Sequence, residues 1–134
     1  MSWKIGDEAS LTKTITSEDI RRFADLLGDH NPIHVDEAYA LTTPFGRPIA
    51  HGMLVGSLVS SVLANQMPGP GTIYLGQNLR FQGPVFSGDT ITAKAVVKDI
   101  RTDKPIYTLE TVCTNQGGET VVAGEAVVLW RAQG

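Results

Sequence analysis

The sequence predicts an α+β fold in which an antiparallel sheet wraps around one buried helix. Residues 53–64 are apolar or small on nearly every helical face, which is typical of a buried central helix. The chain that follows is rich in strand-forming residues, and turn residues at 87–89 and 116–118 divide it into long blocks. Because helices come first and strands follow in succession, we expect an antiparallel sheet with the helices on one side.

The expected strands are longer than the usual length of about five or six residues, so the sheet should curl around the apolar helix and bury it. The strand blocks are 72–81, 89–100, 105–115 and 119–131. A helix wrapped in a sheet is the arrangement of hotdog folds. Such a sheet has open edges, and pairing of an edge strand with a second copy is a common solution, so we expect a homodimer.

The N-terminal part should contribute one short strand and two helices. Residues 10–15 alternate in polarity, as a half-buried strand does. Ser17 is expected to cap a helix whose first turn is acidic and whose apolar stripe continues until Gly28. A second, short helix is expected within residues 36–43.

Composition limits the possible functions. The 134 residues, 42% hydrophobic and 19% charged, fit a single domain over residues 1–134, without repeats or a linker. A net charge of −3 with scattered Lys and Arg argues against nucleic-acid or anionic-membrane partners. Neither a secretory leader nor an apolar run of about 18 residues is found, which predicts a cytoplasmic protein. The lone Cys113 is expected to be a small buried hydrophobe.

The first candidate catalytic segment is residues 29–34. Pro32 lacks a backbone donor and restricts the residue before it, so this segment is expected to be a rigid turn and not a helix or a strand. Asn31 and Pro32 support the turn, which can point the side chains of Asp29 and His34 at one small volume. A carboxylate and an imidazole can hold a water, since one accepts a proton while the other donates one near neutral pH.

The second candidate segment ends at Gly52, at the expected start of the buried helix. The first N–H groups of a helix have no intrahelical partner, and the helix dipole is positive there. Gly52 has no Cβ, so a ligand oxygen can approach its amide closely. Such a donor stabilises negative charge that develops on a carbonyl oxygen during a reaction. Together the two segments offer an acid, a base and an oxyanion donor.

At these motifs the sequence resembles the MaoC-like hydratases, and within them the (R)-specific enoyl-CoA hydratases that supply polyhydroxyalkanoate precursors. The resemblance covers nearly the whole chain. The matching residues are Asp29, Asn31-Pro32, His34, Pro48-Ile49, His51-Gly52-Met53-Leu54, Tyr74-Leu75-Gly76-Gln77, Pro84-Val85-Phe86 and Gly88-Asp89. The combination of an Asp-x-Asn-Pro-x-His turn with Pro-x-x-His-Gly-Met is a specific signal.

The resemblance implies a homodimer of hotdog protomers that hydrates a trans-2-enoyl-CoA thioester to an (R)-3-hydroxyacyl-CoA, without a metal or an organic cofactor. It implies that Asp29 and His34 share the activated water and that the Gly52 amide binds the thioester oxygen. It also suggests that Ser60, a hydroxyl on the central helix, orients Asp29 or the substrate. Which of the two dyad residues takes the first proton stays open, as do the acyl chain length and the physiological direction.

Other interpretations of these side chains are simpler. His30 and His34 have the i, i+4 spacing of a metal site, but Pro32 stands between them and argues against a shared helical face. His51, just before a helix start, is expected to cap or pack and not to touch substrate. Leu63 is expected to be a core residue first and a lining residue of an acyl pocket second. The cations at 94, 98, 101 and 104 are expected to be solvated.

Other functions are also compatible with this fold. The same pair could serve a dehydratase acting on a branched or dicarboxylic acyl-CoA, or the pocket could belong to a non-catalytic acyl-CoA-binding module. A thioesterase on this fold would need a carboxylate on the central helix. Residues 53–64 contain neither Asp nor Glu, which argues against that activity.

Overall fold

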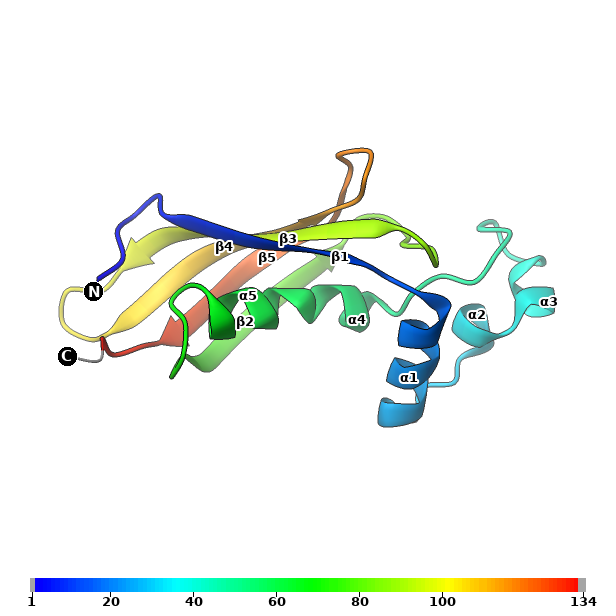
Figure 1. The fold of residues 1–134 in the computed structure, drawn as a ribbon, viewed down its shortest axis with the longest axis horizontal. Coiled ribbons are helices and arrows are strands. Elements are labelled where there is room, and N and C mark those ends of the chain that lie inside the picture. The colour runs from blue at the N-terminus through cyan, green and yellow to red at the C-terminus, as the bar shows by residue number, and fades with distance from the viewer. Residues whose placement is uncertain (1, 133–134) are drawn as a thin grey trace.

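The computed structural model describes residues 2–132, which form one antiparallel sheet with helices against one face and beyond one end (Figure 1). In chain order the elements are β1 (Glu8–Thr14), α1 (Ser17–Leu27), α2 (Pro32–Val35), α3 (Glu37–Ala40), α4 (Gly52–Gly56), α5 (Leu58–Asn65), β2 (Ile73–Phe81), β3 (Thr90–Ile100), β4 (Ile106–Thr114) and β5 (Thr120–Leu129). The α+β fold expected from the sequence is confirmed.

The five strands are ordered β1-β3-β4-β5-β2, and every neighbouring pair is antiparallel. The last three strands follow one another as a meander because short turns join them. β2 lies at one edge, beside β5, and β1 lies at the other edge, beside β3. Within the described part of the chain, no helix is both long and apolar enough to cross a bilayer.

The central helix crosses the sheet in two pieces, α4 and α5, which meet end to end (Figure 1). α5 packs on β1, β3 and β4, and α4 packs on β5. The break falls at Ser57, whose hydroxyl donates to the Leu54 carbonyl at 2.6 Å. A serine that bonds the preceding turn in this way competes with regular helical bonding.

The central helix is buried against the sheet, as expected from its sequence, but not on every side in this chain taken alone. The sheet covers one side, and a stripe at helical spacing faces away from it and is exposed. The stripe consists of Met53, Ser57, Ser60 and Ala64. Met53 is 58% exposed.

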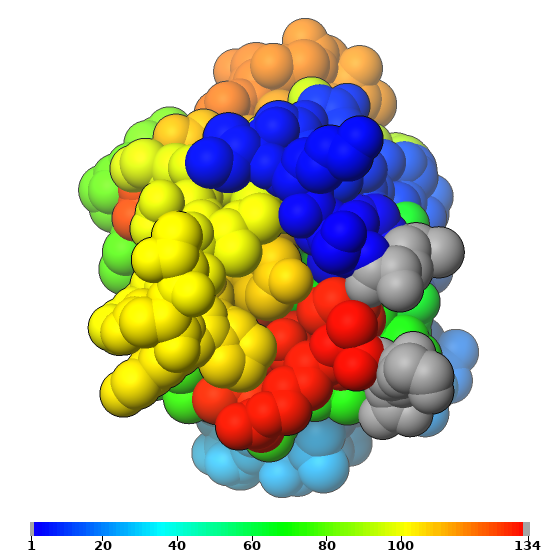
Figure 2. All heavy atoms as spheres, turned by 90° about the vertical axis from the view of Figure 1, so that its left-hand side faces the viewer, coloured from blue at the N-terminus to red at the C-terminus, as the bar shows by residue number. Residues whose placement is uncertain are grey.

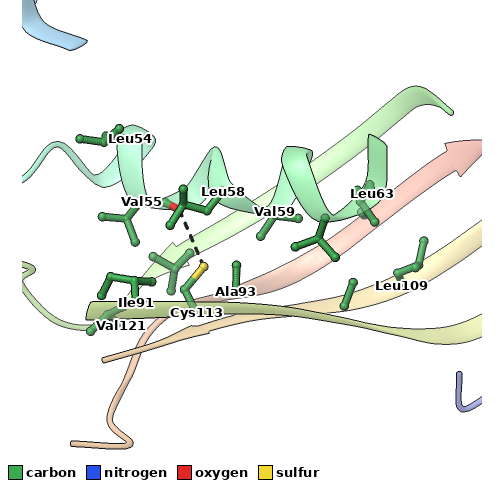
Figure 3. Packing of buried hydrophobic residues seen from close by; sticks show 14 of the residues in the cluster. Leu54, Val55, Leu58, Val59, Leu63, Ile91, Ala93, Leu109, Cys113 and Val121 are labelled. Atoms are coloured by element: carbon green, nitrogen blue, oxygen red, sulfur yellow. Dashed lines mark hydrogen bonds between the residues drawn. The ribbon is translucent and has the colours of Figure 1, made fainter. Parts of the chain in front are cut away.

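The core lies between the central helix and the sheet (Figure 3). Val55 and Val59 point from the helix toward side chains of the strands. Cys113 on β4 is fully buried among them, and its thiol lies 3.8 Å from the Val55 carbonyl oxygen. Burial raises the pKa of this thiol to about 11, so it stays protonated and packs as the small hydrophobe that the sequence predicts.

The two ends of the described chain meet at the end of the sheet opposite α1–α3 (Figures 1 and 2). The rings of Trp3 and Trp130 lie 6.5 Å apart, and the Tyr107 ring packs edge-on against Trp130. Each indole N–H donates to a carbonyl of the loop after α5, at Pro68 and Pro70, with a distance of 3.1 Å in both cases. These contacts tie both ends of the chain to that loop.

The cap of α1 differs from the sequence prediction by one residue. Thr16, not Ser17, is the N-cap, because its hydroxyl accepts from the Asp19 amide while the Asp19 carboxylate accepts from the Thr16 amide, both at 3.0 Å. This reciprocal capping box holds the pKa of Asp19 below its usual value. The helix ends as expected at Gly28, which adopts the left-handed conformation with φ 74°.

Candidate active site

The segment after α1 contains a short helix where the sequence predicted a turn without regular structure. Pro32 is the first residue of α2, a position where a missing N–H costs nothing, and Asn31 is its N-cap. The Asn31 side chain accepts from the Ile33 amide at 3.2 Å, and the Asp29 carboxylate accepts from the Asn31 amide at 3.3 Å. Asn31 and Pro32 therefore shape this segment, but they do so by starting a helix.

His34 lies on α2 and is half-buried. Its Nδ1 lies 2.7 Å from the Ile49 carbonyl oxygen. Because a carbonyl only accepts, Nδ1 carries the hydrogen, and in the neutral ring Nε2 is left as an acceptor. The Ile49 amide in turn donates to the Ile33 carbonyl at 3.1 Å, so two hydrogen bonds join α2 to the segment that leads into α4.

His51 directly precedes α4 and is only 2% exposed. The sequence predicted that it caps or packs. Its side chain does not cap the helix; it packs. Its ring stacks on His34 with the centroids 3.9 Å apart, and Phe23 meets it edge-on at 5.0 Å. Its Nε2–H donates to the Asp29 carbonyl at 3.1 Å. Burial lowers its pKa, which keeps the imidazole neutral.

The structure brings Asp29 and His34 together, with His51 beside them. One carboxylate oxygen of Asp29 and one nitrogen of each imidazole all lie within 4.8 Å of one another. His30 is not part of this cluster, because its Nε2 pairs with the exposed Asp25 carboxylate at 2.9 Å. The i, i+4 pair of histidines considered from the sequence therefore does not form, and the histidine that joins His34 comes from the second motif.

The second motif places Gly52 at the start of α4, next to this cluster. A Cβ built on Gly52 would lie 2.8 Å from two ring atoms of Phe81, so any other residue at this position would force the Phe81 ring or the start of α4 to move. A cavity of about 500 Å³ opens beside Gly52. Its walls are mostly apolar and include Phe45, Met53, Phe81 and Val85.

The other residues named from the sequence lie farther from the cluster. Ser60 is exposed on α5, and at about 1.5 Å per residue it lies about 12 Å along the helix from Gly52. The chain alone does not bring it to Asp29. Leu63 is 1% exposed in the core and is not among the residues that line the cavity beside Gly52. Sequence reasoning missed Phe45 and Phe81, which carry no signal other than being aromatic.

His34 also borders a second hollow, of about 360 Å³, with more polar walls. Arg21, Glu37 and Arg47 contribute to these walls, and the Arg47 guanidinium lies 4.1 Å from the centre of the Phe86 ring. The cations at 94, 98 and 101 lie elsewhere and pair with Glu8, Glu125 and Asp103 on the surface. They are solvated, as the sequence predicts.

Comparison with known proteins shows the family to which the chain belongs. Residues 4–117 match the family model of the MaoC like domain. The chain is 51% identical to the (R)-specific enoyl-CoA hydratase of Aeromonas caviae, over 95% of both chains. It is 48% identical to the (R)-specific enoyl-CoA hydratase of Rhodospirillum rubrum, over 98% of this chain and 90% of that one.

Solved structures support the same assignment. The (R)-hydratase from A. caviae involved in PHA biosynthesis superposes with a TM-score of 0.94 at 50% identity, over 97% of this chain and 98% of that chain. The hotdog arrangement expected from the sequence is thereby confirmed. The chain belongs to the family of proteins with a MaoC-like domain.

Proposed function

We propose that this protein is an (R)-specific enoyl-CoA hydratase, which adds water to a trans-2-enoyl-CoA to give a (3R)-3-hydroxyacyl-CoA. The observation that carries the proposal is the cluster formed by the Asp29 carboxylate and the His34 imidazole, with polar atoms within 4.8 Å of one another, at the start of α4. Relatives with this activity in their names, which match almost the whole chain, support it further.

In the proposed reaction, Asp29 and His34 hold the water between them. One of the two removes a proton from the water as its oxygen bonds to the β carbon, and the other delivers a proton to the α carbon. His34 acts through Nε2, because Nδ1 is committed to the Ile49 carbonyl. The two steps together add one water, with the base holding one extra proton and the acid lacking one. Transfer of that proton from the base to the acid restores the starting protonation state.

The carbonyl oxygen of the thioester gains enolate-like charge in this reaction. The amide of Gly52, at the start of α4, is the proposed donor to that oxygen, since the first N–H groups of a helix have no partner within it. The apolar cavity beside Gly52 is the proposed site for the apolar part of the substrate. Neither role requires a metal or an organic cofactor.

The proposed active form is a homodimer in which a second copy covers β2. This edge strand is exposed along most of its length and carries large apolar side chains, namely Ile73, Tyr74, Leu75 and Phe81. The opposite edge, β1, exposes mainly polar side chains such as Thr12, Lys13 and Thr14. An open apolar edge favours pairing with another strand, whereas a polar edge discourages it.

A coupled assay tests the activity. Purified protein is given crotonyl-CoA, the loss of the enoyl absorbance is followed, and the product is offered to an R-specific or an S-specific 3-hydroxyacyl-CoA dehydrogenase. The proposal requires turnover and oxidation of the product by the R-specific enzyme alone. Lack of turnover with linear enoyl-CoA thioesters, or an S product, would reject it.

A further inference from the structure

We propose that His51 is a positioning residue, which holds Asp29 and His34 in the geometry that the reaction needs without touching the substrate. The inference rests on the hydratase activity proposed above and adds a third residue to it. His51 is 2% exposed, so substrate does not reach it, yet it contacts both members of the pair.

The contact with Asp29 fixes the backbone of that residue. The Asp29 amide donates to the Ala24 carbonyl at the end of α1, at 3.0 Å, and the Asp29 carbonyl accepts from His51 at 3.1 Å. Both peptide groups of Asp29 are therefore held, one by α1 and one by the residue before α4. Although Asp29 lies on an exposed segment, its backbone is therefore fixed, and only rotation about its side-chain bonds can move the carboxylate.

The contact with His34 fixes the plane of its ring. One edge of the ring is held by the Ile49 carbonyl, and one face is covered by the ring of His51, at 3.9 Å and an interplanar angle of 27°. Ile49 and His51 are two residues apart in the chain. A single short segment, residues 49–51, thus holds the imidazole at its edge and at its face, which leaves Nε2 as its free polar atom.

These contacts require a histidine. The stack needs a flat ring, and the bond to Asp29 needs an N–H donor on that ring. The ring must also be uncharged, because a second positive charge at this distance would oppose the proton that His34 carries during turnover. Burial keeps the His51 ring uncharged, because it lowers the pKa of the imidazole. The other ring nitrogen, Nδ1, has no hydrogen-bond partner among the described residues, which fits a nitrogen that carries no hydrogen.

Two substitutions separate the two contacts. His51→Gln keeps a donor for the Asp29 carbonyl but removes the stack, and His51→Phe keeps the stack but removes the donor. We expect kcat for crotonyl-CoA to fall by about 10-fold to 10²-fold in each variant, while KM stays within about 2-fold, since displacement of reacting groups by about 1 Å costs this much. The same two substitutions at the exposed His30 serve as controls and should leave kcat unchanged.

Crystal structures of the variants supply a readout that does not depend on activity. In both His51 variants the separation of the Asp29 carboxylate from the His34 imidazole should exceed the 4.8 Å limit of the present cluster. If His51→Phe fails to fold, His51→Gln still tests whether His51 positions Asp29 and His34. Unchanged kcat in a folded variant, or an intact cluster, overturns the proposal. A wild-type protein inactive on enoyl-CoA thioesters would reject the hydratase function, and the crystallographic comparison would still decide the role of His51.

Discussion

Two ring atoms of Phe81 on β2 lie only 2.8 Å from the point where any other residue at position 52 would place its Cβ. The sheet edge and the start of the central helix are thus in direct contact at the proposed oxyanion donor. A change at either residue should therefore affect the other.

Gly52→Ala is expected to lower kcat/KM for crotonyl-CoA by about 10-fold to 10²-fold, because relief of the overlap displaces the amide that is proposed to bind the thioester oxygen. Steady-state kinetics measure this effect. Gly56→Ala is the matched control, since its Cβ would meet a methyl group of Leu79 at the same 2.8 Å, one turn away from the cluster. Equal losses in both variants would assign the effect to packing and remove Gly52 from the mechanism.

Replacement of the dyad is expected to abolish turnover without unfolding. Asp29→Asn keeps an oxygen for the Asn31 amide, and His34→Asn keeps an N–H donor for the Ile49 carbonyl, so each preserves the local hydrogen bonds. Each should lower kcat by at least about 10²-fold, the usual contribution of a general acid or base. Circular dichroism should show an unchanged melting temperature to within a few degrees.

The control for these variants is Asp25→Asn, which removes the exposed carboxylate paired with His30 outside the cluster. It should retain full activity. Wild-type rates in folded Asp29→Asn would instead remove Asp29 from the mechanism.

Stability should decrease in mild acid because of His51. Burial lowers its pKa in the folded state below the ordinary value of 6.5. The unfolded chain then binds more protons than the folded chain as the pH falls below that value, so the free energy of unfolding decreases until the pH is below the folded pKa. Melting temperatures between pH 7.5 and 5 should fall more steeply for the wild type than for His51→Phe. Parallel curves would mean that His51 is protonated equally in both states.

The apolar edge predicts which substitution breaks the dimer. Leu75→Glu on β2 places a charge where a second copy is expected, and Leu75 is 53% exposed in one chain. Light scattering after gel filtration should find a dimer for the wild type and monomers for this variant. Thr12→Glu, on the opposite edge, should remain dimeric. A monomeric wild type would exclude the proposed assembly.

Much of the fold could be predicted from the sequence, because strands and helices follow from local patterns. The four strand blocks appear as β2–β5, and the apolar run appears as α4 and α5. The sequence prediction is wrong where the hydrogen bonds of single side chains decide where a helix begins or breaks. Thr16 takes the cap expected of Ser17, and Ser57 interrupts a helix whose composition gives no sign of a break.

The site was predictable in part. The turn joining Asp29 and His34 is local, so the two could be paired from sequence. The partnership of His51 with both, and of Phe81 with Gly52, depends on how distant segments pack. No periodicity or spacing encodes such contacts. The pattern around Pro32 predicts a turn, because Pro interrupts a helix at most positions, but at the first position of α2 it favours one.

Both tryptophans of the chain, Trp3 and Trp130, lie together at the end of the sheet opposite α1–α3. Their emission therefore reports on one region only. Intrinsic fluorescence should change when the whole fold is lost and stay constant when a thioester binds in the distant cavity beside Gly52. An optical probe of ligand occupancy would have to be introduced near α4, where the native chain has no indole.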